Sequence, residues 1–226
     1  MLDNPFIPGY ILHRRALAED KLILQLLLPD VGRVSAVVRK QNAKQRVSMQ
    51  PFQALSLQLI GRAELKTVAK IEELAPAFNL QGKVLFSAMY INELICRIWP
   101  NDLATEHLFS LYQYSLQQLA AVTDTQLQLE PCLRQFEFSL LIELGIAIDW
   151  QTDYSGQAIV GQQRYQWLNE QGFMPAKTGW QGQHLLNIGD QLWADPETRR
   201  CAKQLSRILL APLLGAKPLA SKALFS

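Results

Sequence analysis

Five short apolar or alternating runs fill the first eighty residues and leave no room for a long helix between them. They cover residues 10–16, 21–28, 33–39, 52–60 and 63–71. Alternation of apolar and polar residues at period two is the pattern of a strand with one buried and one solvated face. In the third run Val34, Ala36 and Val38 share one face and both flanking arginines lie on the other. We therefore expect five antiparallel strands.

Strands of this number and length close most readily into a small barrel, because closure removes exposed strand edges. The five-stranded OB arrangement is the commonest such barrel, and an SH3-like barrel is the alternative on pattern alone. Gly61 and Arg62 are predicted to form the tight connection between the last two strands. On the last strand, Glu64, Lys66 and Lys70 are expected to share a face.

The rest of the chain is predicted to be mainly helical. Apolar residues at spacings of three and four, together with Pro and Gly at the ends, place helices over residues 82–99, 105–122, 131–145 and 196–212. Asp195 is the expected N-cap of the last helix. Residues 146–194 read as loops with short strands, whose four tryptophans are taken as core fillers. The predicted fold class is α+β, with an OB-fold barrel over residues 1–80 and a helical domain with this insert over 81–226.

Charge is divided unevenly between these two parts. Residues 1–80 carry eleven Lys and Arg against seven Asp and Glu, whereas the remainder carries eleven against thirteen. A basic half in a chain of small net charge points to a polyanionic partner for that half. Over residues 31–70 there are eight cations and one acid, Glu64. Such a surface attracts phosphates, although a solvated loop is the alternative for the cations of residues 40–50.

A DNA-binding surface is predicted on the basic part of the barrel. Phe52 is the only aromatic residue between positions 11 and 77, so stacking on bases is expected to be minor and phosphate contacts dominant. Binding of this kind tolerates any sequence and also accepts duplex. The candidate residues are Arg33, Arg39, Lys40, Lys44, Arg46, Arg62 and Lys66.

No motif for catalysis is found in the sequence. It contains no P-loop, no GxSxG, no HExxH and no GxGxxG after a strand, and its three histidines have no metal-ligand spacing. Three widely separated cysteines fit a reducing cytoplasm and offer no zinc pattern. No signal peptide and no apolar stretch of about 20 residues is present. We expect a soluble cytoplasmic protein that is not an enzyme and needs no cofactor.

Four stretches resemble the RecO family of bacterial repair proteins, and together they cover nearly the whole chain. They are residues 50–52 with 61–67, residues 89–94 (MYINEL) with Arg97, residues 133–137 (LRQFE) with Leu140, Leu141 and Gly145, and residues 217–222 (KPLASK) with Leu224 and Phe225. Each is weak alone, but their order and spacing match the family. Many members hold zinc through paired cysteines in the region of residues 146–175, and this chain has none there. The resemblance therefore implies a zinc-lacking member.

Membership would imply a nucleoid-associated mediator that binds single- and double-stranded DNA and anneals strands without ATP. It would also imply docking on the C-terminal tail of single-stranded DNA-binding protein, and help from RecR in loading RecA. An acidic tail with an apolar end requires a hydrophobic groove beside a cation. The predicted tail site is Arg134, Phe136, Lys203 and Arg207. The alternative for Arg134 is a pair within its helix with Glu130 or Glu137.

Two other functions remain compatible with the residues. A protein-interaction adaptor could use the basic face for acidic partners and would not bind an oligonucleotide at low salt. An RNA-binding OB protein would prefer RNA over DNA of the same sequence.

Overall fold

The computed structural model describes residues 4–40, 47, 49–61 and 63–225. The chain forms two compact units, of which the first combines Met1–Thr123 with Ala216–Ser226 and the second is Asp124–Gly215. The change from strands to helices occurs near residue 80, as expected, and lies within the first unit. That residue 80 is also a domain boundary stays a prediction. No helix in the described ranges is both long and apolar enough to cross a membrane.

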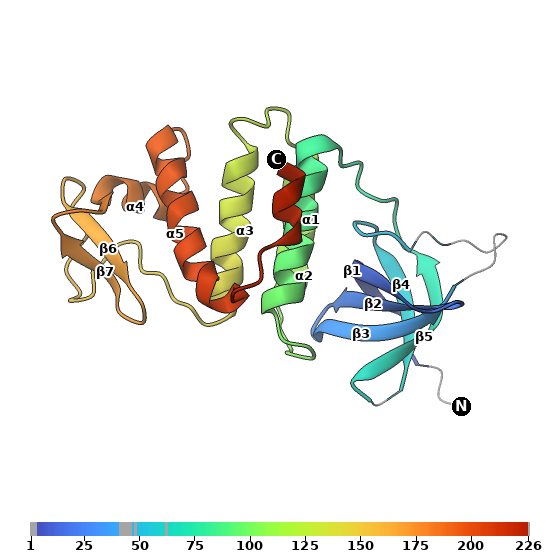
Figure 1. Ribbon diagram of the computed structural model, residues 1–226. Coiled ribbons are helices and arrows are strands. Elements are labelled where there is room, and N and C mark those ends of the chain that lie inside the picture. The colour runs from blue at the N-terminus through green and yellow to red at the C-terminus, as the bar shows by residue number, and fades with distance from the viewer. Residues whose placement is uncertain (1–3, 41–46, 48, 62, 226) are drawn as a thin grey trace. The chain divides into compact units, whose positions relative to one another are not determined.

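The first five strands close into a barrel, as predicted (Figure 1). They are β1 (Ile7–Ala18), β2 (Lys21–Leu28), β3 (Gly32–Arg39), β4 (Leu55–Ile60) and β5 (Leu65–Glu73). Their order around the barrel is β1-β2-β3-β5-β4, with β3 and β5 parallel and the other neighbours antiparallel. This is the OB arrangement, which the sequence favoured over the SH3-like alternative. β4 starts three residues later than expected, after a turn in which Phe52 has a φ of 69°.

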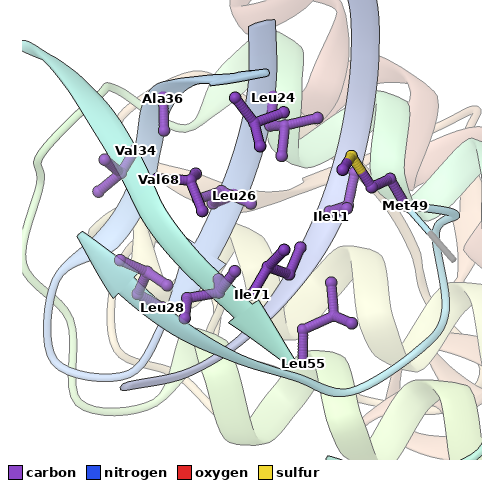
Figure 2. Packing of buried hydrophobic residues seen from close by; sticks show 12 residues of the cluster. Ile11, Leu24, Leu26, Leu28, Val34, Ala36, Met49, Leu55, Val68 and Ile71 are labelled. Carbon is purple, nitrogen blue, oxygen red and sulfur yellow. The ribbon is translucent and has the colours of Figure 1, made fainter. Parts of the chain in front are cut away.

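The barrel core comes from the alternating residues of β2 and β3, together with apolar residues from the other strands (Figure 2). Every second residue from Leu24 to Leu28 and from Val34 to Val38 is buried in this core, which confirms the predicted alternation. Met49, from the segment between β3 and β4, packs into the same cluster. The other face of β2 and β3 carries the polar residues that the candidate interface uses.

A β-bulge in β5 changes which side chains share a face. Val68 and Ile71 both lie in the barrel core although they are three residues apart. The pairing with β4 passes from Leu59–Val68 to Gln58–Lys70 and leaves Ala69 as the extra residue. Lys66 therefore shares the core-facing side with Val68, whereas Lys70 lies on the outer side. The prediction that Lys66 and Lys70 share a face is wrong, because the bulge interrupts the alternation between them.

Two helices, α1 (Gly82–Ile98) and α2 (Leu108–Ala120), join the barrel through a buried hydrogen-bond network. A register shift in β1 falls between Ile11 and His13, so Leu12 is the extra residue there. Asn92 of α1 donates from Nδ2 to the carbonyl oxygen of Leu12 (2.9 Å) and accepts at Oδ1 from the hydroxyl of Tyr112 (2.8 Å). Asn92 thus satisfies a carbonyl group at the bulge and ties β1, α1 and α2 together.

The C-terminal 3₁₀ helix η2 (Ala220–Phe225) packs on α1. The carboxylate of Glu93 accepts hydrogen bonds from the backbone N–H groups of Ala220 (2.7 Å) and Ser221 (2.8 Å). Burial alone would raise the pKa of Glu93, but hydrogen bonds from Ser221 and Ala220 and the charge of Arg97 outweigh it and lower the pKa. Arg97 donates to the carbonyl oxygens of Lys217 (2.8 Å) and Pro218 (3.3 Å). Two separate sequence stretches, MYINEL with Arg97 and KPLASK, are therefore the two sides of one contact.

The start of β3 approaches the chain after α1 so closely that only glycine fits. Gly32 has a φ of +80°, and a Cβ there would lie 2.3 Å from the carbonyl oxygen of Leu103. We expect Gly32→Ala to lower the free energy of unfolding by about 1–3 kcal/mol, measured by urea denaturation. Gly61→Ala is the matched control, because Gly61 also has a positive φ (+100°) but nothing within 4 Å of its Cβ position. Equal losses in both variants would contradict the steric part of this explanation.

The second unit packs α3 (Leu129–Glu143) against α5 (Pro196–Leu214). Beside α5 lie α4 (Gly182–Gly189) and a small sheet of β6 (Arg164–Leu168), β7 (Gly172–Ala176) and β8 (Trp180–Gln181). The short strands agree with the prediction for residues 146–194, but α4 does not. This helix has only eight residues and begins and ends with glycine. The apolar residues between the glycines are too few to show a helical period in the sequence.

Aromatic side chains hold the insert together. Trp150 packs edge-on against Phe138 of α3 and also contacts Phe173, which in turn contacts Trp167. The ring centroids in this chain are 5.1–5.8 Å apart, the usual range for aromatic pairs. Both tryptophans are half-buried and pack against other aromatic rings, as expected of packing residues. The predicted N-cap is also confirmed, since Asp195 accepts hydrogen bonds from the backbone N–H groups of Glu197 and Thr198.

Candidate nucleic-acid interface

Of the basic residues predicted to bind DNA, the four that the structure describes lie in three places. Lys44, Arg46 and Arg62 lie outside the described residues. Arg39 and Lys40 come together at the end of β3, and Lys66 lies at the start of β5. Arg33 lies at the opposite end of β3, beside the end of α1. The assignment of all seven residues to DNA stays a prediction.

Arg33 is held by the protein itself. Its Nε donates to the carbonyl oxygen of Trp99 (2.8 Å) and its Nη1 to Oε1 of Gln25 (2.8 Å). The carbonyl oxygen of Arg33 accepts from the backbone N–H of Asp102 (2.8 Å). The half-buried guanidinium thus fixes β3 to the C-terminal end of α1, a structural role that its sequence position did not reveal.

Arg39 and Lys40 meet the tip of the β1–β2 hairpin. Arg39 forms an ion pair with Asp20 (3.2 Å) in which both side chains are more than half exposed. Lys40 donates from Nζ to the carbonyl oxygen of Glu19 (2.6 Å). Its backbone N–H donates to the carbonyl oxygen of Asp20 (2.8 Å). An exposed ion pair contributes little to stability, so the Arg39 guanidinium can exchange its carboxylate for a phosphate at small cost.

Three further cations at this end of the barrel were missed by the sequence reasoning. Arg14 and Arg15 of β1 and Lys21 of β2 are exposed. Pairing brings them next to the predicted residues, because Lys21 lies opposite Arg39 in the β2–β3 ladder. Together with Arg39 and Lys40 they make five cations against the two acids Glu19 and Asp20, so the hairpin end has a net positive charge. These three residues belong to the eleven cations of residues 1–80, but only the register of the β1–β2 hairpin places them beside Arg39 and Lys40.

One exposed aromatic also lies on the outside of the barrel. Phe6 is 41% exposed, and Nζ of Lys70 lies 6.0 Å from the centroid of its ring. This position precedes the first alternating run and was therefore overlooked. A cation over one face leaves the other face of the ring for a planar group such as a base.

The predicted partner-tail residues divide into two buried and two more exposed side chains. Arg134 is buried on α3, where its Nη2 pairs with Oε1 of Glu137 (2.7 Å) and its Nη1 donates to Oγ of Ser206 on α5 (2.8 Å). The pairing with Glu137 that was the alternative for Arg134 is therefore present. Phe136 is 1% exposed and belongs to the core. Both side chains lie beneath the surface that α3 and α5 offer.

Lys203 and Arg207 lie on α5, one helical turn apart. Lys203 donates to the carboxylate of Glu130 on α3, with both side chains partly exposed. Arg207 is exposed, and next to it Ile208 is 44% exposed. A cation beside an exposed apolar side chain is what an acidic peptide with an apolar end requires. The tail assignment of all four residues stays a prediction.

Cys96, Cys201 and His184 lie outside these surfaces and are buried or held by hydrogen bonds. Burial raises the pKa of the Cys96 thiol to about 11 and that of Cys201 to about 12, which keeps both thiols protonated. Nδ1 of His184 lies 3.1 Å from both Thr198 and Asp195, at the start of α5. In the part of the chain that the structure describes, no three His, Cys, Asp or Glu side chains form a group that could hold a metal ion. The predicted lack of zinc stays a prediction.

A closed OB barrel with a basic end, followed by helices, places the chain among OB-fold proteins with an added helical part. The family model "Recombination protein O N terminal" matches residues 7–77, and "Recombination protein O C terminal" matches residues 80–223. The chain therefore belongs to the RecO family of DNA repair proteins. The family resemblance and the OB fold expected from the sequence are both confirmed.

Individual relatives match over nearly the full length of both chains. The DNA repair protein RecO of Stutzerimonas stutzeri is 39% identical over 96% of this chain and 92% of its own length. The corresponding proteins of Alteromonas mediterranea and Cellvibrio japonicus are 36% and 39% identical, and the matches cover 99% and 97% of this chain and 98% and 95% of the relatives. The likeness thus includes both units.

Proposed function

We propose that this chain is a non-enzymatic recombination mediator of the cytoplasm and nucleoid. It binds single- and double-stranded DNA, anneals complementary strands without ATP, docks on the C-terminal tail of single-stranded DNA-binding protein and, with RecR, helps to load RecA. The observation that carries the proposal is the cluster of exposed cations at the hairpin end of an OB barrel in a RecO-family chain. Lys and Arg on such a surface displace the counterions condensed on DNA.

Phosphate-dominated binding gives a measurable salt dependence. If about four phosphates of a single strand are neutralised, log affinity falls with log salt concentration at a slope of about −3. We expect the double variant Arg39→Gln with Lys40→Gln to weaken binding and to flatten the slope to about −1.4, because about two contacts are lost. Anisotropy of a labelled oligonucleotide measures both quantities.

Lys83→Gln with Lys177→Gln is the control, because both lysines are exposed and neither lies on the barrel. An unchanged affinity and slope in the Arg39 and Lys40 variant would refute the barrel surface as the DNA site. No binding by the wild type at low salt would favour the adaptor, and a preference for RNA of the same sequence would favour an RNA-binding protein.

Docking of the partner tail is proposed for the surface of α5 that carries Lys203 and Arg207. The exposed side chain of Ile208 would contact the apolar end of the tail. Arg134 and Phe136 are buried below this surface, and Arg134 holds α3 and α5 together through its hydrogen bond to Ser206. The test is annealing of oligonucleotides coated with single-stranded DNA-binding protein, with and without its tail. Deletion of the tail should reduce annealing by the wild type and have little further effect on Lys203→Glu with Arg207→Glu. Annealing that does not depend on the tail would remove this docking site.

A further inference from the structure

Phe6 is the exposed aromatic side chain of the barrel. Residues 4–73 contain three aromatic residues, and Phe6 is 41% exposed whereas Tyr10 and Phe52 are 3% and 7% exposed. Ile7 packs against the core opposite Leu57, so Phe6, one residue earlier, faces the outside of the barrel. Its ring therefore offers a flat apolar surface to solvent.

The side chain beside Phe6 is a cation, and the bulge in β5 brings it there. Nζ of Lys70 lies 6.0 Å from the centroid of the Phe6 ring. Without the extra residue Ala69, Lys70 would follow Val68 by two positions of regular alternation minus none and would point into the core with it. With the bulge, Lys70 faces outward and Ile71 returns to the core. The distance is at the outer limit of a cation–π contact, so the ammonium can turn toward a phosphate at small cost.

Lys70 also continues the outer face of the barrel that carries Arg39. β3 and β5 run parallel, and Val37 is opposite Thr67 on the outer side. Arg39 is the next outward residue of β3 after Val37, and Lys70 follows Thr67 on the outer side past the bulge. Glu72, exposed two residues further on, repels phosphates and bounds this surface. The cations of the hairpin end and the Phe6 ring thus lie along one outer surface.

We propose that Phe6 stacks on one base of a single DNA strand while Lys70 binds an adjacent phosphate. This inference rests on the proposed function and adds to it a place where a base is bound as well as the backbone. Stacking accepts every base, because each has a π face, so binding stays independent of sequence. In duplex DNA the bases are stacked on one another and cannot reach the ring. The contact therefore makes the barrel prefer single strands over duplex.

An exposed apolar side chain can also serve only to cover the residues beneath it. Asn4, however, already holds the N-terminal segment on β4. Its carbonyl oxygen accepts from Nε2 of Gln58 (2.6 Å), and its Nδ2 donates to the carbonyl oxygen of Leu59 (2.6 Å). If Phe6 were only a cover for Gln58, its replacement would change stability without distinguishing one kind of DNA from another.

The experiment compares two single-stranded probes of equal length and charge, an oligothymidylate and the same backbone with abasic sites, together with a duplex. Anisotropy measures the affinity of the full chain for each. Phe6→Leu keeps an apolar side chain and every charge but removes the ring. We expect it to weaken binding of oligothymidylate about fivefold or more, the contribution of one stacked base, and to leave the other two affinities unchanged. Phe225→Leu is the matched control, because this ring is 47% exposed and lies on η2.

Lys70→Gln tests the phosphate contact separately. The loss of one contact to a single strand should flatten the slope of log affinity against log salt concentration by about 0.7, with the oligothymidylate and the abasic strand alike. Phe6→Leu should leave this slope unchanged, since it removes no charge. Lys83→Gln is the control, because Lys83 is exposed on α1. An unchanged slope in Lys70→Gln would overturn the assignment of Lys70.

Unchanged binding of oligothymidylate by Phe6→Leu would overturn the proposal. Equal losses on the oligothymidylate and the abasic strand would also overturn it, because the ring would then act only through the fold. If Phe6→Leu does not fold, Phe6→Trp takes its place. Its added fluorescence should be quenched by oligothymidylate and not by the abasic strand, and equal quenching by both would overturn the proposal. Absence of any DNA binding by the wild type would instead refute the proposed function.

Discussion

Glu137→Gln should lower the free energy of unfolding of the second unit by about 3–5 kcal/mol, because it leaves a buried guanidinium without its carboxylate. The side chains of Arg134 and Glu137 are 8% and 0% exposed and pair at 2.7 Å. Arg134 also donates to Ser206 on α5, so the uncompensated charge lies between the two helices that build the unit. Urea denaturation followed by tryptophan fluorescence measures the loss, since four of the five tryptophans belong to Asp124–Gly215.

An ion pair of the same spacing on the surface provides the control. Arg200 and Glu197 are also three residues apart on one helix, at 3.2 Å, but their side chains are 69% and 59% exposed. Glu197→Gln should therefore change stability by at most about 0.5 kcal/mol. Replacing both buried partners by apolar residues, Arg134→Met with Glu137→Leu, should recover most of the loss because no unpaired charge remains. A double variant as unstable as Glu137→Gln alone would contradict the desolvation argument.

Alternation and helical periodicity predicted the regular parts of this fold. The inward residues of β2 and β3 follow from the period of two, and the main helices lie within a few residues of their predicted bounds. Bulges could not be predicted in this way, because an extra residue such as Leu12 or Ala69 depends on the partner strand. The packing of η2 on α1 was missed for the same reason, since its contacts join residues more than a hundred positions apart.

The candidate interface was predicted in its chemistry and only partly in its residues. A count of charges along the chain identified Arg39 and Lys40, which are exposed at the hairpin end. The same count included Arg33, whose hydrogen bonds to Trp99 and Gln25 depend on the position of α1. Arg14 was counted among the basic residues of 1–80 but was not a candidate, because only the register of β1 with β2 brings it toward the same end. Charge is visible in a sequence, whereas the partners of each charge come from tertiary contacts.

In the first unit, Asn92→Leu should lower the free energy of unfolding by about 2–6 kcal/mol, because it leaves two buried groups without hydrogen bonds, each at a cost of about 1–3 kcal/mol. The two groups are the carbonyl of Leu12 at the β1 bulge and the hydroxyl of Tyr112. Burial raises the pKa of Tyr112 well above its usual value, so this hydroxyl stays protonated and remains a donor. Denaturant unfolding followed by far-UV circular dichroism measures the loss.

A second substitution separates the two contributions. Adding Tyr112→Phe to Asn92→Leu removes the stranded hydroxyl and should recover about 1–3 kcal/mol, while the carbonyl of Leu12 stays unpaired. Gln113→Leu is the control, because its amide donates to the hydroxyl of Tyr10 (3.2 Å) at a partly buried position and should matter by about 1 kcal/mol or less. If Tyr112→Phe brought no recovery, the network would be no more than ordinary packing. Recovery would show that part of the loss comes from the stranded hydroxyl of Tyr112, and the loss that remains would measure the unpaired carbonyl of Leu12 at the β1 bulge, which Asn92 satisfies in the wild type.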